Sequence, residues 1–198
     1  MPTASSFTIG AIFSDEQIGT LLEAIWNSES RTVLESELGN RPICNRDQSW
    51  VRRQYAPSRY PRFHAPHGWH QDGALGFDYA SYPQGNYPAD ALLRMVTCWI
   101  ALDDCGVDAP SLEFVTRPFR KLLSPADLGD APIRARFPVG EFLQARIKAG
   151  EGLLFGGHSL HRTFVAAQMT RDRTSIELRF FTRAPERLKP DRFLPVEG

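Results

Sequence analysis

LLRMVTCWIAL, residues 92–102, is a short run of apolar, β-branched and aromatic residues that ends in the turn-forming sequence DDCG at residues 103–106. A run of this length and composition favours a buried β-strand. Downstream, residues 112–116 alternate and stop before Pro118, which predicts a second strand. Further strands, with turn signals between them, are predicted at residues 142–147, 152–155, 162–166 and 174–182.

A helix signal precedes these strands. Ser14 and Gln17 are spaced as a capping box, and apolar residues at positions 18, 21, 22 and 25 predict a helix over about residues 15–27. Residues 41–87 show no sustained periodicity and are expected to be loop-dominated, and a short helix or turn is predicted at residues 124–127. Many short strands behind a helix predict a mainly β fold with flanking helices, a β-sandwich or jelly roll, in one domain of residues 1–198.

The amino-acid composition limits the classes of binding partner and the cellular setting that are expected. Lys+Arg and Asp+Glu balance at 23 each, which argues against nucleic acid or an anionic membrane and favours a small-molecule partner. Three cysteines, at positions 44, 98 and 105, are an odd number without a CxxC pair, so neither a disulfide framework nor a structural zinc site is expected. Without a signal peptide or a membrane-spanning run, the chain is predicted to be soluble and cytoplasmic.

All five histidines lie in two clusters, His64, His67 and His70 in the first and His158 and His161 in the second. If residues 69–73 are extended, the period of two places His70 and Asp72 on one face and turns Gln71 the other way. A histidine from the second cluster would complete two nitrogens and one carboxylate, the ligand set of non-haem Fe(II) oxygenases.

Other interpretations of these histidines stay open. An isolated H-x-D is a weak signal, because loop histidines often only cap turns or bond backbone carbonyls. The second cluster strengthens the metal hypothesis, because it follows GEGLLFGG, an apolar strand that ends in glycines, where backbone can approach an ion closely. A catalytic zinc also remains open, although there is no HExxH motif.

The last predicted strand has two unlike faces. Thr174, Ile176, Leu178 and Phe180 share one face, whereas the other face carries Arg173, Ser175, Glu177 and Arg179. Such a strand could simply be half exposed. Just after a candidate metal-binding histidine, however, an arginine fork is also what a dicarboxylate such as 2-oxoglutarate requires, and the Thr163 hydroxyl can add to the same carboxylate.

Taken in order, these blocks resemble the phytanoyl-CoA dioxygenase-like family of Fe(II)/2-oxoglutarate oxygenases. The resemblance covers about residues 63–181 and consists of WHQD (69–72), CWIALD (98–103), GEGLLF (150–155), HSLHRT (158–163) and RTSIE (173–177). It implies a double-stranded β-helix (jelly-roll, cupin-like) core over about residues 60–183 behind a helical part over about residues 14–40. It also implies Fe(II), 2-oxoglutarate and O2 as cofactors.

Carried over residue by residue, the resemblance assigns His70, Asp72 and His161 as iron ligands and Arg173 and Thr163 as partners of the far carboxylate of 2-oxoglutarate. His158 matches a position that is usually not a ligand. The chain departs from the family in lacking a P-G-S-H turn after the strand at residues 112–116, in carrying Glu151 for the usual aspartate and in being short. Because Asp72 is retained, hydroxylation or another oxidation is expected rather than halogenation.

Further contacts are predicted near the metal block. Gln71 is expected beside the cofactor, and Trp69, Phe77, Tyr79 and Arg179 are expected to bind the substrate. The flanking segments are rich in aromatic and cationic residues, which suits an anionic, partly apolar small molecule; they include Trp50, Arg52, Arg53, Tyr55, Tyr60, Phe63, Phe77, Tyr79 and Tyr82. Two alternatives remain, a cupin-like metal-dependent enzyme that does not use 2-oxoglutarate and a non-catalytic jelly-roll binding module.

Overall fold

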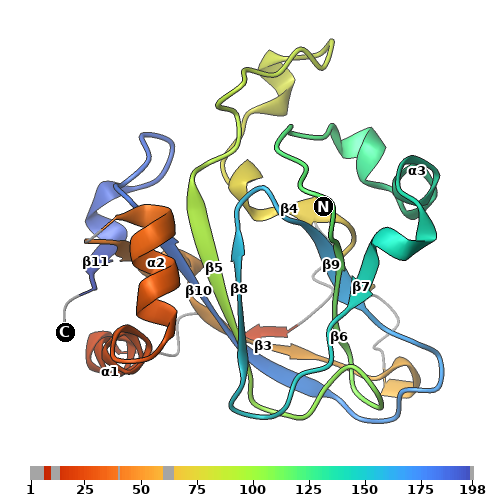
Figure 1. Cartoon of the computed structure of the whole chain (residues 1–198), viewed down its shortest axis with the longest axis horizontal. Helices are drawn as coiled ribbons and strands as arrows, with labels where there is room; N and C mark the ends of the chain where they lie inside the picture. The colour runs from red at the N-terminus through yellow and green to blue at the C-terminus, as the bar shows by residue number, and fades with distance from the viewer. Residues whose placement is uncertain (1–6, 10–13, 40, 60–64, 197–198) are drawn as a thin grey trace.

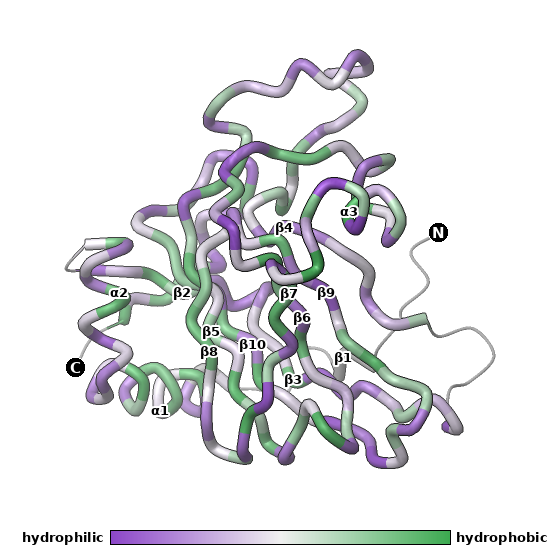
Figure 2. Tube along the Cα trace, turned by 45° about the vertical axis from the view of Figure 1, so that its right-hand side comes forward, coloured by the Kyte–Doolittle hydropathy of each residue, from purple (hydrophilic) through white to green (hydrophobic). Residues whose placement is uncertain are grey.

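Two antiparallel β-sheets face each other in this computed structural model, which describes residues 7–9, 14–39, 41–59 and 65–196 (Figure 1). The predicted mainly β fold is confirmed. The cores lie between the sheets and on the outer face of the larger sheet. In Figure 2 apolar and polar colour alternates along many of the strands, as expected where one face of each strand meets a core.

The larger sheet is built around β10 (Arg173–Phe181), the longest strand. On one side β10 pairs along most of its length with β5 (Met95–Ala101), and β5 pairs in turn with β8 (Gly152–Gly156). On its other side the first half of β10 pairs with β3 and its last two residues with β2. The outer strands complete the sheet; they are β1 (Phe7–Ile9) beside β3 (Trp50–Gln54) and β11 (Phe193–Pro195) beside β2 (Ile43–Asn45).

The smaller sheet has the order β4, β9, β6, β7. Its strands are β4 (His70–Gln71), β9 (Leu160–Phe164), β6 (Ser111–Val115) and β7 (Phe142–Gln144). In the antiparallel pair of β4 and β9, His70 lies directly opposite His161. The register of this sheet therefore brings the two histidine clusters of the sequence together.

Among the described residues, three α-helices flank the sheets (Figure 1). Helix α1 (Asp15–Trp26) begins at the predicted capping box of Ser14 and Gln17, and it is followed by α2 (Ser30–Leu38). Their apolar residues cover the outer face of the larger sheet, where Ile18, Leu22 and Leu34 join one core with Val96, Ile176 and Leu178. Helix α3 (Asp130–Arg136) packs beside the smaller sheet, and Ser124 caps the predicted short helix, a 3₁₀ turn at Pro125–Leu128.

Most of the described residues in 41–87 are irregular or turn, as predicted, but the segment also contains two strands that were not predicted, β2 and β3. The buried side chains of β3 include Arg52 and Gln54, so the strand lacks the apolar alternation by which strands are recognised. The larger sheet thereby begins before residue 60 and, through β11, extends beyond residue 183. No helix among the described residues is long and apolar enough to cross a membrane.

Candidate metal centre

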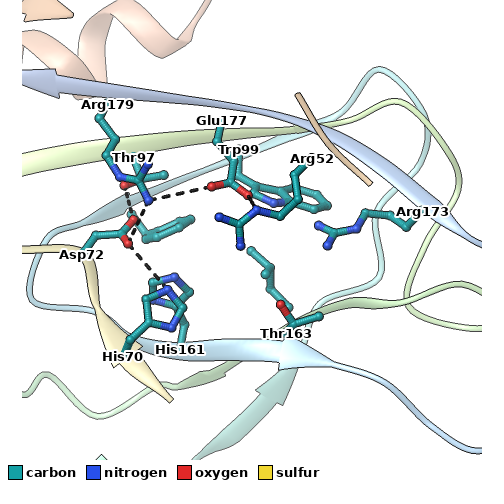
Figure 3. Close-up of a pocket in the computed structure, with 12 residues that line it drawn as sticks. Arg52, His70, Asp72, Thr97, Trp99, His161, Thr163, Arg173, Glu177 and Arg179 are labelled. Carbon is teal, nitrogen blue, oxygen red and sulfur yellow. Dashed lines mark hydrogen bonds and ion pairs between the residues drawn. The ribbon is translucent and has the colours of Figure 1, made fainter. Parts of the chain in front are cut away.

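His70, Asp72 and His161 converge between the two sheets (Figure 3). One ligand atom of each residue lies within 4.8 Å of the others, and His70 Nε2 is 3.6 Å from Asp72 Oδ1. The strand register places the two histidines opposite each other, and Asp72 begins a 3₁₀ turn directly after β4, so its carboxylate stays on the His70 side. The donor set is two imidazoles and one carboxylate, which suits Fe(II) with further positions open.

Backbone carbonyls orient both imidazole rings. His70 Nδ1 lies 2.8 Å from the Gly68 carbonyl oxygen, and His161 Nδ1 lies 3.0 Å from that of Ser159. Because a carbonyl can only accept, each Nδ1 carries a proton and donates it, and in a neutral imidazole this tautomer leaves the lone pair on Nε2. This is the arrangement that orients imidazoles toward a metal ion, so the ring geometry fits a metal centre.

Two buried groups hold the Asp72 carboxylate. Thr97 Oγ1 on β5 donates to Oδ2 at 2.6 Å, and Arg179 Nη2 on β10 donates to Oδ1 at 3.1 Å. Burial alone would raise the pKa of Asp72, but the Arg179 charge, the two histidines and the Thr97 hydrogen bond together lower it below its usual value. Burial and the adjacent histidines also lower the pKa of His70. The site therefore holds an ionised carboxylate beside an uncharged imidazole, the protonation states that a metal ion needs.

Arg173 lies in the same hollow with part of its guanidinium unsatisfied (Figure 3). The residue is fully buried and Nη1 donates to Ser175 Oγ at 3.1 Å, but Nε and Nη2 have no hydrogen-bond partner within the described part of the chain. Burial lowers its pKa to about 10, so the group is still cationic at neutral pH. Thr163 on β9 lines the same hollow. Unpaired buried donors are costly, and a carboxylate seated here would satisfy them.

The hollow is narrow in this conformation. Its free space is about 10 Å³, which holds about one water molecule. The walls include Trp99, which is fully buried and lies under the Arg173 guanidinium at 5.0 Å from its ring centroid. Binding of a molecule as large as 2-oxoglutarate therefore requires some of the side chains around Trp99 to move.

The structure places Gln71 and Trp69 outside this hollow, against the predicted cofactor and substrate contacts. The Gln71 amide donates to the carbonyls of Lys121 and His158 and accepts from the Leu123 backbone, so it fastens the loop that precedes α3. Trp69 is buried in the core beside α3 and donates from Nε1 to Asp130. Strand alternation explains the positions of both side chains, because it turns residues 69 and 71 away from the face that carries His70.

Arg179 lines the hollow as predicted, but its Nη1 and Nη2 donate to protein oxygens, and only Nε has no hydrogen-bond partner among the described residues. Besides Asp72, the guanidinium donates to the Gln48 carbonyl and lies over the Trp50 ring at 4.5 Å. Phe77 and Tyr79 belong to an aromatic cluster with Tyr82 and Tyr87, in the loop that projects beyond the sheets in Figure 1. Neither lines the hollow; Tyr79 instead borders a separate open crevice of about 720 Å³.

The remaining histidines occupy distinct positions. His158 lies outside the ligand cluster, beside Glu37 and Arg120 in another crevice. His67 stacks on the His70 ring at 4.0 Å and accepts a hydrogen bond at Nδ1 from Arg52. The residue is exposed at the surface, but the loss of water around its ring on the protein side and the Arg52 charge lower its pKa to about 4. His64, like Tyr60 and Phe63, lies outside the described residues.

Two polar residues that line the hollow, Thr97 and Glu177, were not predicted to do so, and a third, Arg52, was predicted only as one of several aromatic and cationic residues that flank the metal block. Glu177 is buried between Arg52 and Arg179 and accepts a hydrogen bond from Trp50 Nε1. Glu177 had a signal in its alternation with Arg173 and Arg179, and Thr97 had one as a polar residue inside an apolar strand. Arg52 was not distinguished from the other residues of that group, because β3 itself was not predicted.

The chain belongs to the phytanoyl-CoA dioxygenase family, whose sequence model matches residues 10–165 of 198. The predicted resemblance is confirmed. A search by sequence among curated proteins found no match. Three similar solved structures are SnoN, SnoK and EctD.

SnoN is a non-heme alpha ketoglutarate dependent epimerase of nogalamycin biosynthesis, with 16% identity and a TM-score of 0.58 over 98% of this chain and 80% of SnoN. SnoK, a carbocyclase from the same biosynthesis, has 18% identity and a TM-score of 0.55 over 93% of this chain and 69% of its own. EctD from S. alaskensis has 14% identity and a TM-score of 0.62 over 92% of this chain and 59% of EctD. These likenesses concern the fold, and with them the predicted jelly-roll core is confirmed.

Proposed function

We propose that residues 1–198 form a single-domain non-haem Fe(II)/2-oxoglutarate-dependent dioxygenase that hydroxylates an unactivated C–H bond of a small molecule. Family membership supports the class of enzyme. The observation that carries the proposal is that His70, Asp72 and His161 share a hollow with a buried, partly unsatisfied Arg173. A metal-ligand set and a carboxylate anchor in one hollow are what a metal-bound dicarboxylate requires.

Each residue has a role in this proposal. His70, Asp72 and His161 hold the iron, and Arg173 with Thr163 binds the far carboxylate of 2-oxoglutarate. The chemistry supplied by bound iron is the oxidation of substrate by O2, coupled to conversion of 2-oxoglutarate to succinate and CO2. Phe114 and Phe155 pack against the His161 ring and exclude water from that side of the centre.

The central experiment measures succinate formation by the iron-reconstituted protein over a panel of small acids, with the product mass recorded. A gain of one oxygen atom supports hydroxylation, whereas loss of two hydrogens, or a product of unchanged mass, indicates a different oxidation or an epimerisation. Turnover that does not depend on 2-oxoglutarate would favour the cupin-like alternative. Absence of stoichiometric metal would favour a non-catalytic binding module.

Two pairs of variants test the assigned residues. His161→Ala is expected to abolish iron retention, whereas His158→Ala, the matched control from the same cluster, is expected to retain the metal. Arg173→Ala is expected to weaken 2-oxoglutarate binding by about tenfold or more, as loss of a charge-assisted pair does. Trp99 provides a direct readout, because its fluorescence is expected to change when 2-oxoglutarate enters the narrow hollow.

The protein's setting is part of the proposal. The cysteines Cys44, Cys98 and Cys105 are all free and buried. Free thiols are typical of a reducing compartment, and this supports a cytoplasmic location. The expected partner is a small molecule.

A further inference from the structure

Three arginines reach the hollow around the candidate metal centre, and two of them already have partners or a proposed ligand. Arg179 is bonded to Asp72 and to the Gln48 carbonyl. Arg173 faces the place proposed for the far carboxylate of 2-oxoglutarate. Arg52 on β3 is the third, and its role is not accounted for by the metal or by the cosubstrate.

Arg52 lies between the interior of the hollow and its mouth. Its Nε is 3.1 Å from Glu177 Oε1, and Nη1 lies 3.2 Å from His67 Nδ1. Nη2 has no hydrogen bond to any residue in the part of the chain that the structure describes. His67 is exposed and stacks on His70, so this end of the hollow meets solvent. Figure 3 shows the guanidinium of Arg52 turned into the space between the histidines and Arg173.

The charges around the hollow do not balance. The described side chains that line it include three cations, Arg52, Arg173 and Arg179, and two anions, Asp72 and Glu177, which leaves one positive charge. A divalent metal ion and 2-oxoglutarate, a dianion, cancel each other. One positive charge therefore remains after both have bound, in a site whose charged residues are all at most 9% exposed. A buried uncompensated charge is costly, so a site of this kind favours a ligand that neutralises it.

We propose that the substrate carries one negative charge, such as a carboxylate, and that Arg52 binds this group. The inference rests on the proposed function, because the charge balance counts both iron and 2-oxoglutarate. Arg52 is the suitable group because it has a free donor edge at the mouth, where a substrate enters after the cosubstrate. The pairing with Glu177 holds the guanidinium in place without satisfying all of its donors.

Calorimetry on the protein loaded with Mn(II) and 2-oxoglutarate tests the proposal without turnover. The probes are acetate, benzoate, 3-phenylpropanoate and octanoate, each compared with its neutral amide. At least one carboxylate is expected to bind wild type about ten- to a hundredfold more tightly than its amide, as a charge-assisted hydrogen bond provides. Arg52→Gln is expected to remove this preference while leaving the affinity for 2-oxoglutarate within about threefold of wild type.

Two further variants keep the test independent of any folding defect in Arg52→Gln. Glu177→Gln adds a second uncompensated positive charge and is expected to tighten carboxylate binding relative to the amide, an effect opposite in sign to that of Arg52→Gln. Arg53→Gln is the matched control, since the adjacent arginine of β3 pairs with Asp172 and does not line the hollow. It is expected to leave the preference unchanged.

The possible failures are distinguishable. If 2-oxoglutarate does not bind the Mn(II)-loaded wild-type protein, the proposed function is refuted and this inference with it. If 2-oxoglutarate binds but no carboxylate is preferred over its amide, the inference alone is refuted. A preference that survives in Arg52→Gln, or a loss of 2-oxoglutarate affinity of tenfold or more in that variant, would assign Arg52 to another role and also overturn it.

Discussion

Thr97→Val tests whether a single buried hydrogen bond holds the proposed metal carboxylate in place. Thr97 is 1% exposed on β5, and its Oγ1 donates to Asp72 Oδ2 at 2.6 Å. Valine has nearly the same shape and favours β-strands, so the substitution removes the hydroxyl with little change in packing. Asp72 would keep its ion pair with Arg179 but lose the donor that fixes its second oxygen.

The expected magnitude follows from the charge and burial of the pair. A hydrogen bond to an ionised group contributes about 1.5–3 kcal/mol, so the free energy of unfolding of the metal-free protein should fall by about this amount. Loss of a group that orients a metal ligand typically weakens metal binding by about 10–100-fold. Urea denaturation measures the first quantity, and calorimetric titration with Mn(II) or Co(II) measures the second.

Thr174→Val is the matched control, because Thr174 is a partly buried threonine of β10 on the face turned away from the hollow, and its hydroxyl makes no hydrogen bond to a described residue. This variant should leave metal affinity unchanged. If Thr97→Val binds metal within about twofold of wild type, the hydrogen bond does not hold Asp72 in its binding position. The account of the carboxylate given above would then be wrong.

Three further predictions follow from the packing. Gly157→Ala should lower the free energy of unfolding by about 1–3 kcal/mol in urea denaturation, because the added Cβ would lie 2.6 Å from Met95 Cγ and 2.7 Å from the Leu93 carbonyl oxygen. Gly140 has open space around it, so Gly140→Ala should leave this free energy unchanged. Equal effects of the two substitutions would refute the packing argument. Burial raises the pKa of Cys44 to about 11 and that of Cys98 to about 12. Mass spectrometry should therefore find that iodoacetamide at about pH 8 alkylates neither thiol until the chain is unfolded. Rapid labelling of the native protein would contradict this expectation. Arg187→Ala removes hydrogen bonds to the Gly73 and Ala91 carbonyls, so limited proteolysis should cut the loop between them faster; an unchanged rate would mean that Arg187 does not hold it.

Sequence patterns predicted helix α1 and strand β10, which bury apolar side chains, and they missed strand β3, which buries polar side chains. Helix α1 and strand β10 show the expected periods, and their apolar faces pack into one core. The sequence of β10 left open the hypothesis that its polar face is exposed to solvent. The structure excludes this hypothesis, because Arg173, Glu177 and Arg179 are buried. Strand β3 was missed because its inward residues, such as Arg52, are charged or polar, and its register comes from pairing with β10.

The sequence also brought the ligand candidates together, because alternation relates His70 to Asp72 and the family resemblance adds His161. It assigned Arg173 to 2-oxoglutarate and Arg179 to the substrate, but it could not predict that Arg179, on the same face of β10, pairs with Asp72. Their difference depends on which end of β10 lies near Asp72, a contact between residues more than a hundred positions apart. Hydrophobic periodicity carries no information on such contacts, and this explains why Arg179 was assigned to the substrate instead of to Asp72.

The pairing of β4 with β9 has a consequence for how this centre can change under mutation. His70 and His161 are direct cross-strand neighbours, so the distance between their backbones is the fixed spacing of two paired antiparallel strands. A ladder shifts only by whole residues, and a shift by one residue would turn one histidine to the opposite face of the sheet. Point substitutions can therefore alter which atoms surround the two rings, but the distance between the strands that carry them cannot drift by small degrees.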